Sequence, residues 1–110
     1  MQITYVDPGE MLSLVDFVDP GVNPLDEGEE QTIYSGIPAR IRQTRSSETL
    51  KSKQVVDQVI TEVAIKYLPG LKTRYRVKFE DKTFDIWGIR DPDMLHVDLL
   101  IDCVELGDGD

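Results

Sequence analysis

The chain has 110 residues, 40% of them apolar and 30% charged, which is a globular rather than a disordered composition. Its net charge of −9 argues against general nucleic-acid binding, because such binding needs Lys and Arg to neutralise phosphates. The single cysteine, Cys103, excludes an intrachain disulfide and fits a reducing compartment. No apolar run approaches about 18 residues and the N-terminus lacks a signal-peptide pattern, so we expect a protein made in the cytoplasm with no membrane partner.

The charges are distributed unevenly along the chain. Residues 1–39 contain eight acids and no bases, residues 40–90 contain all twelve bases and six acids, and residues 91–110 contain seven acids and no bases. The net charges of the three segments are therefore −8, +6 and −7. The interpretation that we favour is that these charges pair across the fold. The alternative is a partly basic surface on an acidic body, which would suit a charged partner.

The first part of the chain predicts two short strands with the same ending. An apolar pattern over Met1–Val6 indicates a strand, and Leu12–Val18 indicates another. Each is followed by Asp-Pro-Gly, which is a strong turn sequence. The segment 21–31 is polar and acidic, so we expect an exposed loop there.

A third strand is predicted over Thr32–Arg42, where Gly36 and Pro38 indicate a bulge or an edge position. The most hydrophilic stretch, Gln43–Lys53, follows it and predicts a long projecting loop. A short helix from about Glu48 to residue 54 is an alternative within this loop, because Ser and Glu suit the first turn of a helix.

The second half of the chain shows a much clearer pattern of alternating apolar and polar residues, which is typical of half-buried antiparallel strands. The predicted strands are Val59–Tyr67, Thr73–Phe79, Phe84–Ile89 and Leu95–Cys103. Six or seven short strands predict a small all-β antiparallel barrel. We expect a single domain over residues 1–110, with an N-terminal extension at 1–9 and a flexible acidic tail at 106–110.

The chain offers little that would support catalysis. Its one histidine, His96, lies on the polar face of the last predicted strand, and Cys103 lies on the opposite, apolar face. The two side chains are therefore not expected to form a catalytic dyad. No spacing of Cys and His fits a zinc site, and no Gly-rich phosphate loop is present. We expect no enzyme, metal or cofactor, although the plentiful acids leave a small carboxylate-dependent hydrolase as a less favoured alternative.

The order of strands and turns in the second half resembles the head closure family, the head–tail joining or stopper proteins of tailed bacteriophages. The pieces that carry the resemblance are Ile60–Tyr67, Pro69-Gly70, Arg76–Phe79, Thr83–Ile86, the turn Asp91-Pro92-Asp93, and Leu99–Glu105 with its Cys-x-Glu ending. The first half of the chain fits the family pattern more loosely. The resemblance covers about residues 11–105.

This resemblance implies a structural virion protein of the neck between head and tail. It implies a closed ring of about twelve copies beneath the portal or its adaptor, which helps to retain packaged DNA and docks the tail. The implied partners are further copies of the chain, the portal or adaptor, tail terminator or tail proteins, and non-specifically the packaged DNA. A tail-completion or minor tail protein is the nearest alternative.

In such rings a long loop between early strands points toward the central channel, and Gln43–Lys53 is the matching segment here. We therefore expect a loop that lines the channel or meets a partner through these residues: Arg40, Arg42, Gln43, Arg45, Lys51 and Lys53.

Overall fold

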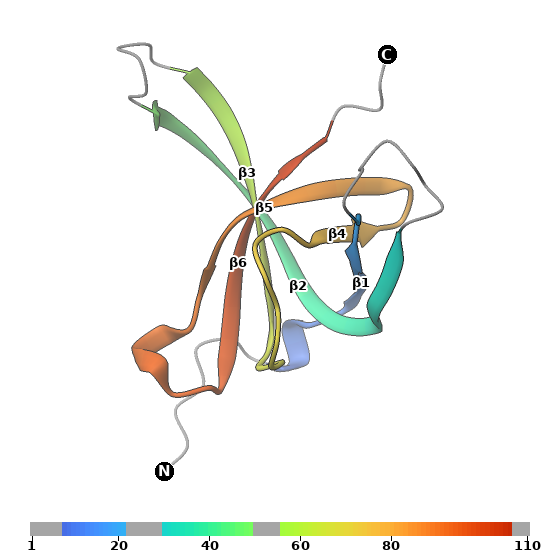
Figure 1. Ribbon diagram of the computed structural model, residues 1–110. Coiled ribbons are helices and arrows are strands. Elements are labelled where there is room, and N and C mark those ends of the chain that lie inside the picture. The colour runs from blue at the N-terminus through green and yellow to red at the C-terminus, as the bar shows by residue number, and fades with distance from the viewer. Residues whose placement is uncertain (1–7, 22–29, 50–55, 107–110) are drawn as a thin grey trace.

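The computed structural model describes residues 8–21, 30–49 and 56–106, and in these ranges the chain is all-β. Six antiparallel strands close into one barrel in the order β1-β2-β3-β6-β5-β4 (Figure 1). The strands are β1 (Ser13–Asp19), β2 (Gln31–Thr49), β3 (Val56–Lys66), β4 (Arg76–Phe79), β5 (Lys82–Arg90) and β6 (Asp98–Glu105). Two short 3-10 turns, η1 (Pro8–Glu10) and η4 (Pro92–Met94), complete the description. The predicted fold class is confirmed.

Some predictions concern segments outside the described residues. The strand expected over Met1–Val6, most of the acidic loop at 21–31 and most of the tail at 106–110 belong to this group.

The interior of the barrel is filled by the inward faces of the strands. Large side chains with almost no exposed surface include Phe17, Val63, Ile65, Val77 and Ile101. Each such side chain stabilises the fold by about 1.5–3 kcal/mol relative to an exposed position. The alternation predicted for the second half of the chain is confirmed for β3 and β6. Three buried residues of β3 pair with three buried residues of the neighbouring β6: Thr61 with Cys103, Val63 with Ile101, and Ile65 with Leu99.

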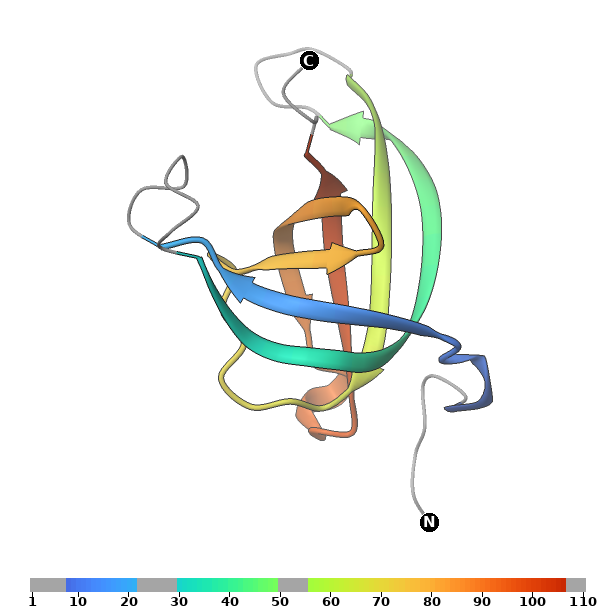
Figure 2. The ribbon, with the colours of Figure 1, turned by 90° about the vertical axis from the view of Figure 1, so that its right-hand side faces the viewer.

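A bulge in β2 lets this strand curve around the barrel. Val15 pairs with Ile37 and Phe17 pairs with Tyr34, so two β2 residues lie opposite Asp16 alone. One of them is Gly36, whose φ of 67° lies in the left-handed region and whose N–H donates a 2.9 Å hydrogen bond to Asp16 Oδ1. The irregularity predicted from the glycine is therefore confirmed as a bulge, and β2 bends sharply in Figure 2.

The predicted end of the third strand at Arg42 is wrong, because β2 continues to Thr49. The short helix predicted from Glu48 is wrong at its start, since Glu48 lies in this strand. Backbone pairing with β3, from Thr44 opposite Ile60 to Thr49 opposite Val56, provides hydrogen bonds that a polar loop would have taken from water. The rest of the predicted loop, residues 50–53, lies outside the described residues.

The last strand begins at Asp98, three residues later than predicted. The preceding residues turn through η4, where Asp93, Met94 and His96 all have positive φ. Asp91 holds this turn, because its Oδ1 accepts a 3.0 Å hydrogen bond from the His96 N–H. Leu95, predicted to face the core, is consequently exposed.

A second bulge interrupts the alternation of inward and outward side chains along β5. Ile86 pairs with Cys103 and Gly88 pairs with Asp102, which leaves Trp87 as the additional residue. Ile86 and Ile89 both pack on the core as a result, and Trp87 is 54% exposed. Alternation from the buried Phe84 and Ile86 already points the indole outward, and the bulge returns the side chain of Ile89 to the core.

Candidate binding surfaces

The most prominent feature outside the barrel is a two-stranded arm, which we define as Thr44–Thr49 of β2 and Val56–Ile60 of β3. Among the described residues the two strands of the arm pair only with each other, because β1 leaves β2 at Ala39 and β6 leaves β3 at Thr61. The arm projects away from the barrel at the upper left of Figure 1. A lone two-stranded ribbon is only marginally stable in water, so a partner that packs on the arm would stabilise it.

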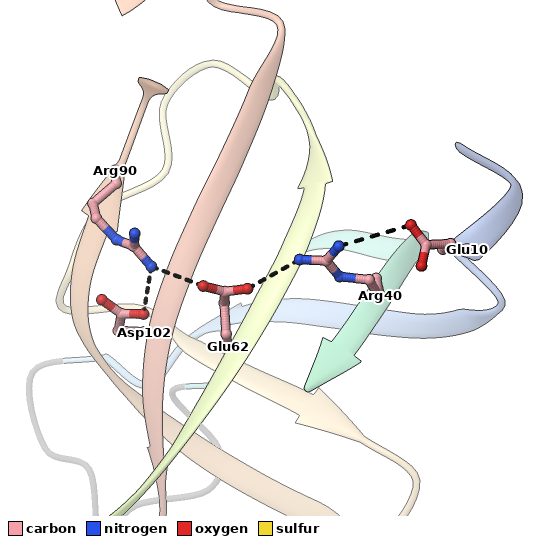
Figure 3. Close-up of polar contacts among 5 residues, drawn as sticks. All are labelled: Glu10, Arg40, Glu62, Arg90 and Asp102. Atoms are coloured by element: carbon pink, nitrogen blue, oxygen red, sulfur yellow. Dashed lines mark hydrogen bonds and ion pairs between the residues drawn. The ribbon is translucent and has the colours of Figure 1, made fainter. Parts of the chain in front are cut away.

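A chain of ion pairs crosses the outer wall of the barrel at the base of the arm (Figure 3). The charge chain consists of Glu10, Arg40, Glu62, Arg90 and Asp102, from η1, β2, β3, β5 and β6 respectively. The successive N···O distances are 3.8, 3.1, 3.0 and 2.9 Å. The charge chain therefore links β2 and β3, the strands that form the arm, to the neighbouring strands β6 and β5.

The middle of the charge chain is well shielded from solvent. The side chains of Arg40 and Glu62 are only 17% and 19% exposed. Burial disfavours the charge of Arg90, but its hydrogen bonds to Asp102 and Glu62 outweigh this effect and raise the pKa of the guanidinium. Since Glu62 accepts from a guanidinium on each side, it is the residue on which the charge chain depends.

The six residues predicted to face a channel or a partner are distributed over different parts of the molecule. They are Arg40, Arg42, Gln43, Arg45, Lys51 and Lys53. Arg40 lies in the barrel wall within the charge chain, whereas Arg42 and its neighbour at position 43 are exposed just before the arm begins. Arg45 lies in the arm opposite Val59. The two lysines lie outside the described residues.

Several ion pairs join the acidic ends of the chain to its basic middle. Asp19 pairs with Arg74 at 3.1 Å, and Glu30 pairs with Lys78 at 2.6 Å. From the C-terminal segment, the buried Asp98 pairs with Lys66 at 2.9 Å. The interpretation that the three charge segments pair across the fold is confirmed for these residues.

Sequence reasoning missed two exposed apolar surfaces on the barrel. The first is an open depression of about 340 Å³ beside Trp87, lined by Ile60, Glu62, Trp87, Gly88, Arg90 and Asp102. The second, which we call the Leu ridge, consists of Leu12 and Leu14, with exposed fractions of 86% and 62%. The sequence could have indicated the Leu ridge, because successive residues of a strand point to opposite faces. The two leucines have even numbers, whereas the inward-facing Val15 and Phe17 have odd numbers.

Neither residue considered for nucleophilic or base chemistry lies in a pocket. The His96 ring packs on the Tyr67 ring with centroids 4.6 Å apart, and its Nδ1 contacts Asp91. Cys103 is fully buried in the core, where burial raises the pKa of its thiol to about 12. Residues 8–21, 30–49 and 56–106 contain no cluster of His, Cys, Asp and Glu that could hold a metal ion. Within the same ranges no helix is long and apolar enough to span a membrane.

Comparison with known proteins gives one informative match. No curated protein sequence matches the chain significantly. The family model described as "Phage head completion protein" matches residues 6–106, which include every described strand and most of the chain. The match also begins before β1, so it takes in the η1 turn that the sequence pattern alone treated as an extension. The chain therefore belongs to the phage head completion protein family.

Proposed function

We propose that this chain is a head closure connector of a tailed bacteriophage, which forms a ring beneath the portal or its adaptor. In this role it helps to keep packaged DNA in the head and provides the surface to which the tail docks. Its work is binding and not chemistry. Membership of the head completion family supports a role in finishing the phage head.

The observation that carries the proposal is the arm. A closed barrel is a rigid base, and the charge chain fixes both strands of the arm to that base. An arm that leaves such a base with both of its edges unpaired, among the described residues, is well placed to reach into a central channel or to contact a neighbour. The bases at 42, 45, 51 and 53 make phosphate or an acidic neighbour the favoured contact.

The opposite end of the barrel offers a separate contact surface. The turn between β5 and β6, orange in Figure 1, lies away from the arm and exposes Met94 and Leu95. Two different ends on one barrel suit a protein that lies between two partners, with the head on one side and the tail on the other. Which end meets which partner is decided by imaging the assembled neck.

The test compares phage particles made without the chain, with the wild-type chain, and with an arm-less variant. In the arm-less variant Thr44 is joined to Ile60 by Asn-Gly, because these residues are paired and Asn-Gly closes a two-residue hairpin. A matched control keeps the arm and changes only Arg45, Lys51 and Lys53 to Gln. The readouts are the DNA content of the heads and the fraction of heads that carry tails.

Particles without the chain are expected to lose DNA and to lack tails. The arm-less variant is expected to bind the portal vertex but to retain DNA poorly, and the glutamine variant is expected to fall between it and the wild type. Full DNA retention without the chain would overturn the proposal. Co-purification of the chain with isolated tails, and not with portal vertices, would instead favour a tail-completion protein.

A further inference from the structure

The depression beside Trp87 has the composition of a small docking site. The indole forms one wall and Ile60 the other, and β6 forms the floor between them. Its lining also includes three charged residues, Glu62, Arg90 and Asp102, in which the 51% exposed side chain of Arg90 is paired with both carboxylates. Trp and Arg are the residue types that most often dominate the energy of protein interfaces. An exposed indole held by a β-bulge on a rigid wall is also pre-organised, so little side-chain entropy is lost on binding.

The Leu ridge is a second exposed surface, and it is apolar. Leu12 and Leu14 stand out from the wall at the start of β1, and the exposed Pro38 lies opposite Leu14 on β2. Glu10, next to the ridge in sequence and at the end of the charge chain, has a side chain that is 54% exposed. The ridge therefore offers two apolar side chains, and the depression offers the apolar side chains of Trp87 and Ile60 beside the paired charges of the charge chain.

These two surfaces lie on opposite walls of the same barrel. In the closed strand order, β6 is three strands away from β1 in either direction, and β6 is the floor of the depression. Figure 2 shows β1 crossing the front of the barrel with β6 behind it. A two-fold axis uses the same face of both copies, so it could place each ridge in the other copy's depression only if the two surfaces lay on one face of the barrel. A head-to-tail contact does so directly, and repeating it produces a ring when the rotation closes.

We infer that the depression beside Trp87 receives Leu12 and Leu14 of a neighbouring copy, and that this contact is the repeating interface of the ring. The inference rests on the ring formation in the proposed function and adds the surfaces that build it.

The first test is site-specific cross-linking of the full-length chain. Two differently tagged variants, Leu14→Cys and Trp87→Cys, are oxidised separately and then as a mixture. The native Cys103 can remain, because burial keeps this thiol protonated and inaccessible. The mixture is expected to give at least tenfold more cross-linked dimer than either variant alone. Equal yields in all three reactions, a dimer formed by either variant alone, or no dimer at any concentration would overturn the inference.

The second test asks whether the contact between copies is head-to-tail. Leu14→Glu and Trp87→Glu each damage one of the two surfaces, and both side chains are exposed, so the barrel is expected to fold in both variants. Each variant alone is expected to remain monomeric by light scattering. Their mixture is expected to form dimers only, because one intact ridge and one intact depression remain. Failure of the mixture to dimerise while the wild type assembles would refute the head-to-tail contact.

The experiments distinguish a failure of the inferred interface from a failure of the proposed function. Particles that retain DNA normally with Trp87→Glu would refute the interface in the virion and leave head closure standing. A chain that cross-links as expected, but whose loss leaves DNA retention unchanged, would refute head closure and leave the interface standing.

Discussion

Arg40 Nη2 lies 3.1 Å from a carboxylate oxygen of Glu62, at the place where β2 and β3 leave the barrel to form the arm. Both side chains are less than one-fifth exposed, so this pair is closer to a buried ion pair than to a surface one. The other Glu62 oxygen accepts from Arg90 at 3.0 Å. One carboxylate therefore compensates two guanidinium groups.

We expect Glu62→Gln to destabilise the protein by about 1–3 kcal/mol, because it leaves the shielded Arg40 without its main counter-charge. The matched control is Asp85→Asn, which breaks the isolated pair of Asp85 with Arg76 at 3.4 Å. Since Asp85 is 47% exposed, this second change is expected to cost less than about 1 kcal/mol. Urea unfolding, which leaves ionic strength unchanged, measures both values. Equal losses in the two variants would show that the charge chain contributes no more than an ordinary surface pair.

Gly36 is required by its backbone conformation and not by lack of space. A Cβ at this position would meet no atom within 4 Å, yet its φ is 67°. Gly36→Ala is therefore expected to cost roughly 1–2 kcal/mol, the penalty of an L-residue in the left-handed region. Gly88→Ala is the matched control, because Gly88 also lies beside a bulge and has equal space but no positive φ. A stability loss of the same size in both variants would contradict this explanation.

The buried thiol of Cys103 predicts a specific dependence on alkaline pH. Burial, followed by the nearby charges of Asp102 and Asp85, raises its pKa from 9.0 to about 12. Between these values the unfolded chain has released the thiol proton and the folded chain still holds it, so stability falls as the pH rises. The contribution is complete below pH 9.0 and is lost at no more than about 1.4 kcal/mol per pH unit across this window.

The comparison that isolates this contribution is Cys103→Val, which keeps an apolar side chain in the core and removes the titrating group. Wild type and variant are unfolded in urea at a series of pH values from neutral to alkaline. As the pH rises, the free energy of unfolding of the wild type is expected to fall relative to that of the variant. At neutral pH the wild-type thiol should react with an alkylating reagent only after unfolding. Parallel pH profiles, or fast labelling of the folded protein, would contradict the burial argument.

The parts of this fold that could be predicted from the sequence are those in which one face of a strand is buried. The odd residues of β3 and β6 alternate so regularly that their pairing faces follow from the sequence. The β2 half of the arm could not be predicted in this way. It is held by backbone hydrogen bonds to β3 beyond the barrel, and polar residues such as Thr44 and Ser46 resemble a loop.

Two further effects prevented the candidate surfaces from being predicted from the sequence. The bulge at Trp87 inserts one residue into β5, so a strictly alternating pattern places Ile89 on the outer face with Trp87, whereas Ile89 packs on the core. The charge chain depends on which strands become neighbours. That Glu62 lies between Arg40 and Arg90 follows only from the strand order β2-β3-β6-β5. Parity can place a residue on the outer face, but it cannot say which residue of another strand it will meet.

Trp87 also provides a direct optical test of the inferred ring contact, because it is the only tryptophan in the chain. In the isolated barrel its indole is 54% exposed, so its fluorescence should be that of a solvated tryptophan and should be quenched readily by acrylamide. Insertion of Leu12 and Leu14 from a neighbour would remove water from the indole. We therefore expect a blue shift of the emission and weaker quenching as the protein concentration rises. Leu14→Glu should abolish both changes without altering the spectrum of the dilute protein. A wild-type spectrum that stays unchanged while light scattering reports assembly would place the interface elsewhere on the barrel.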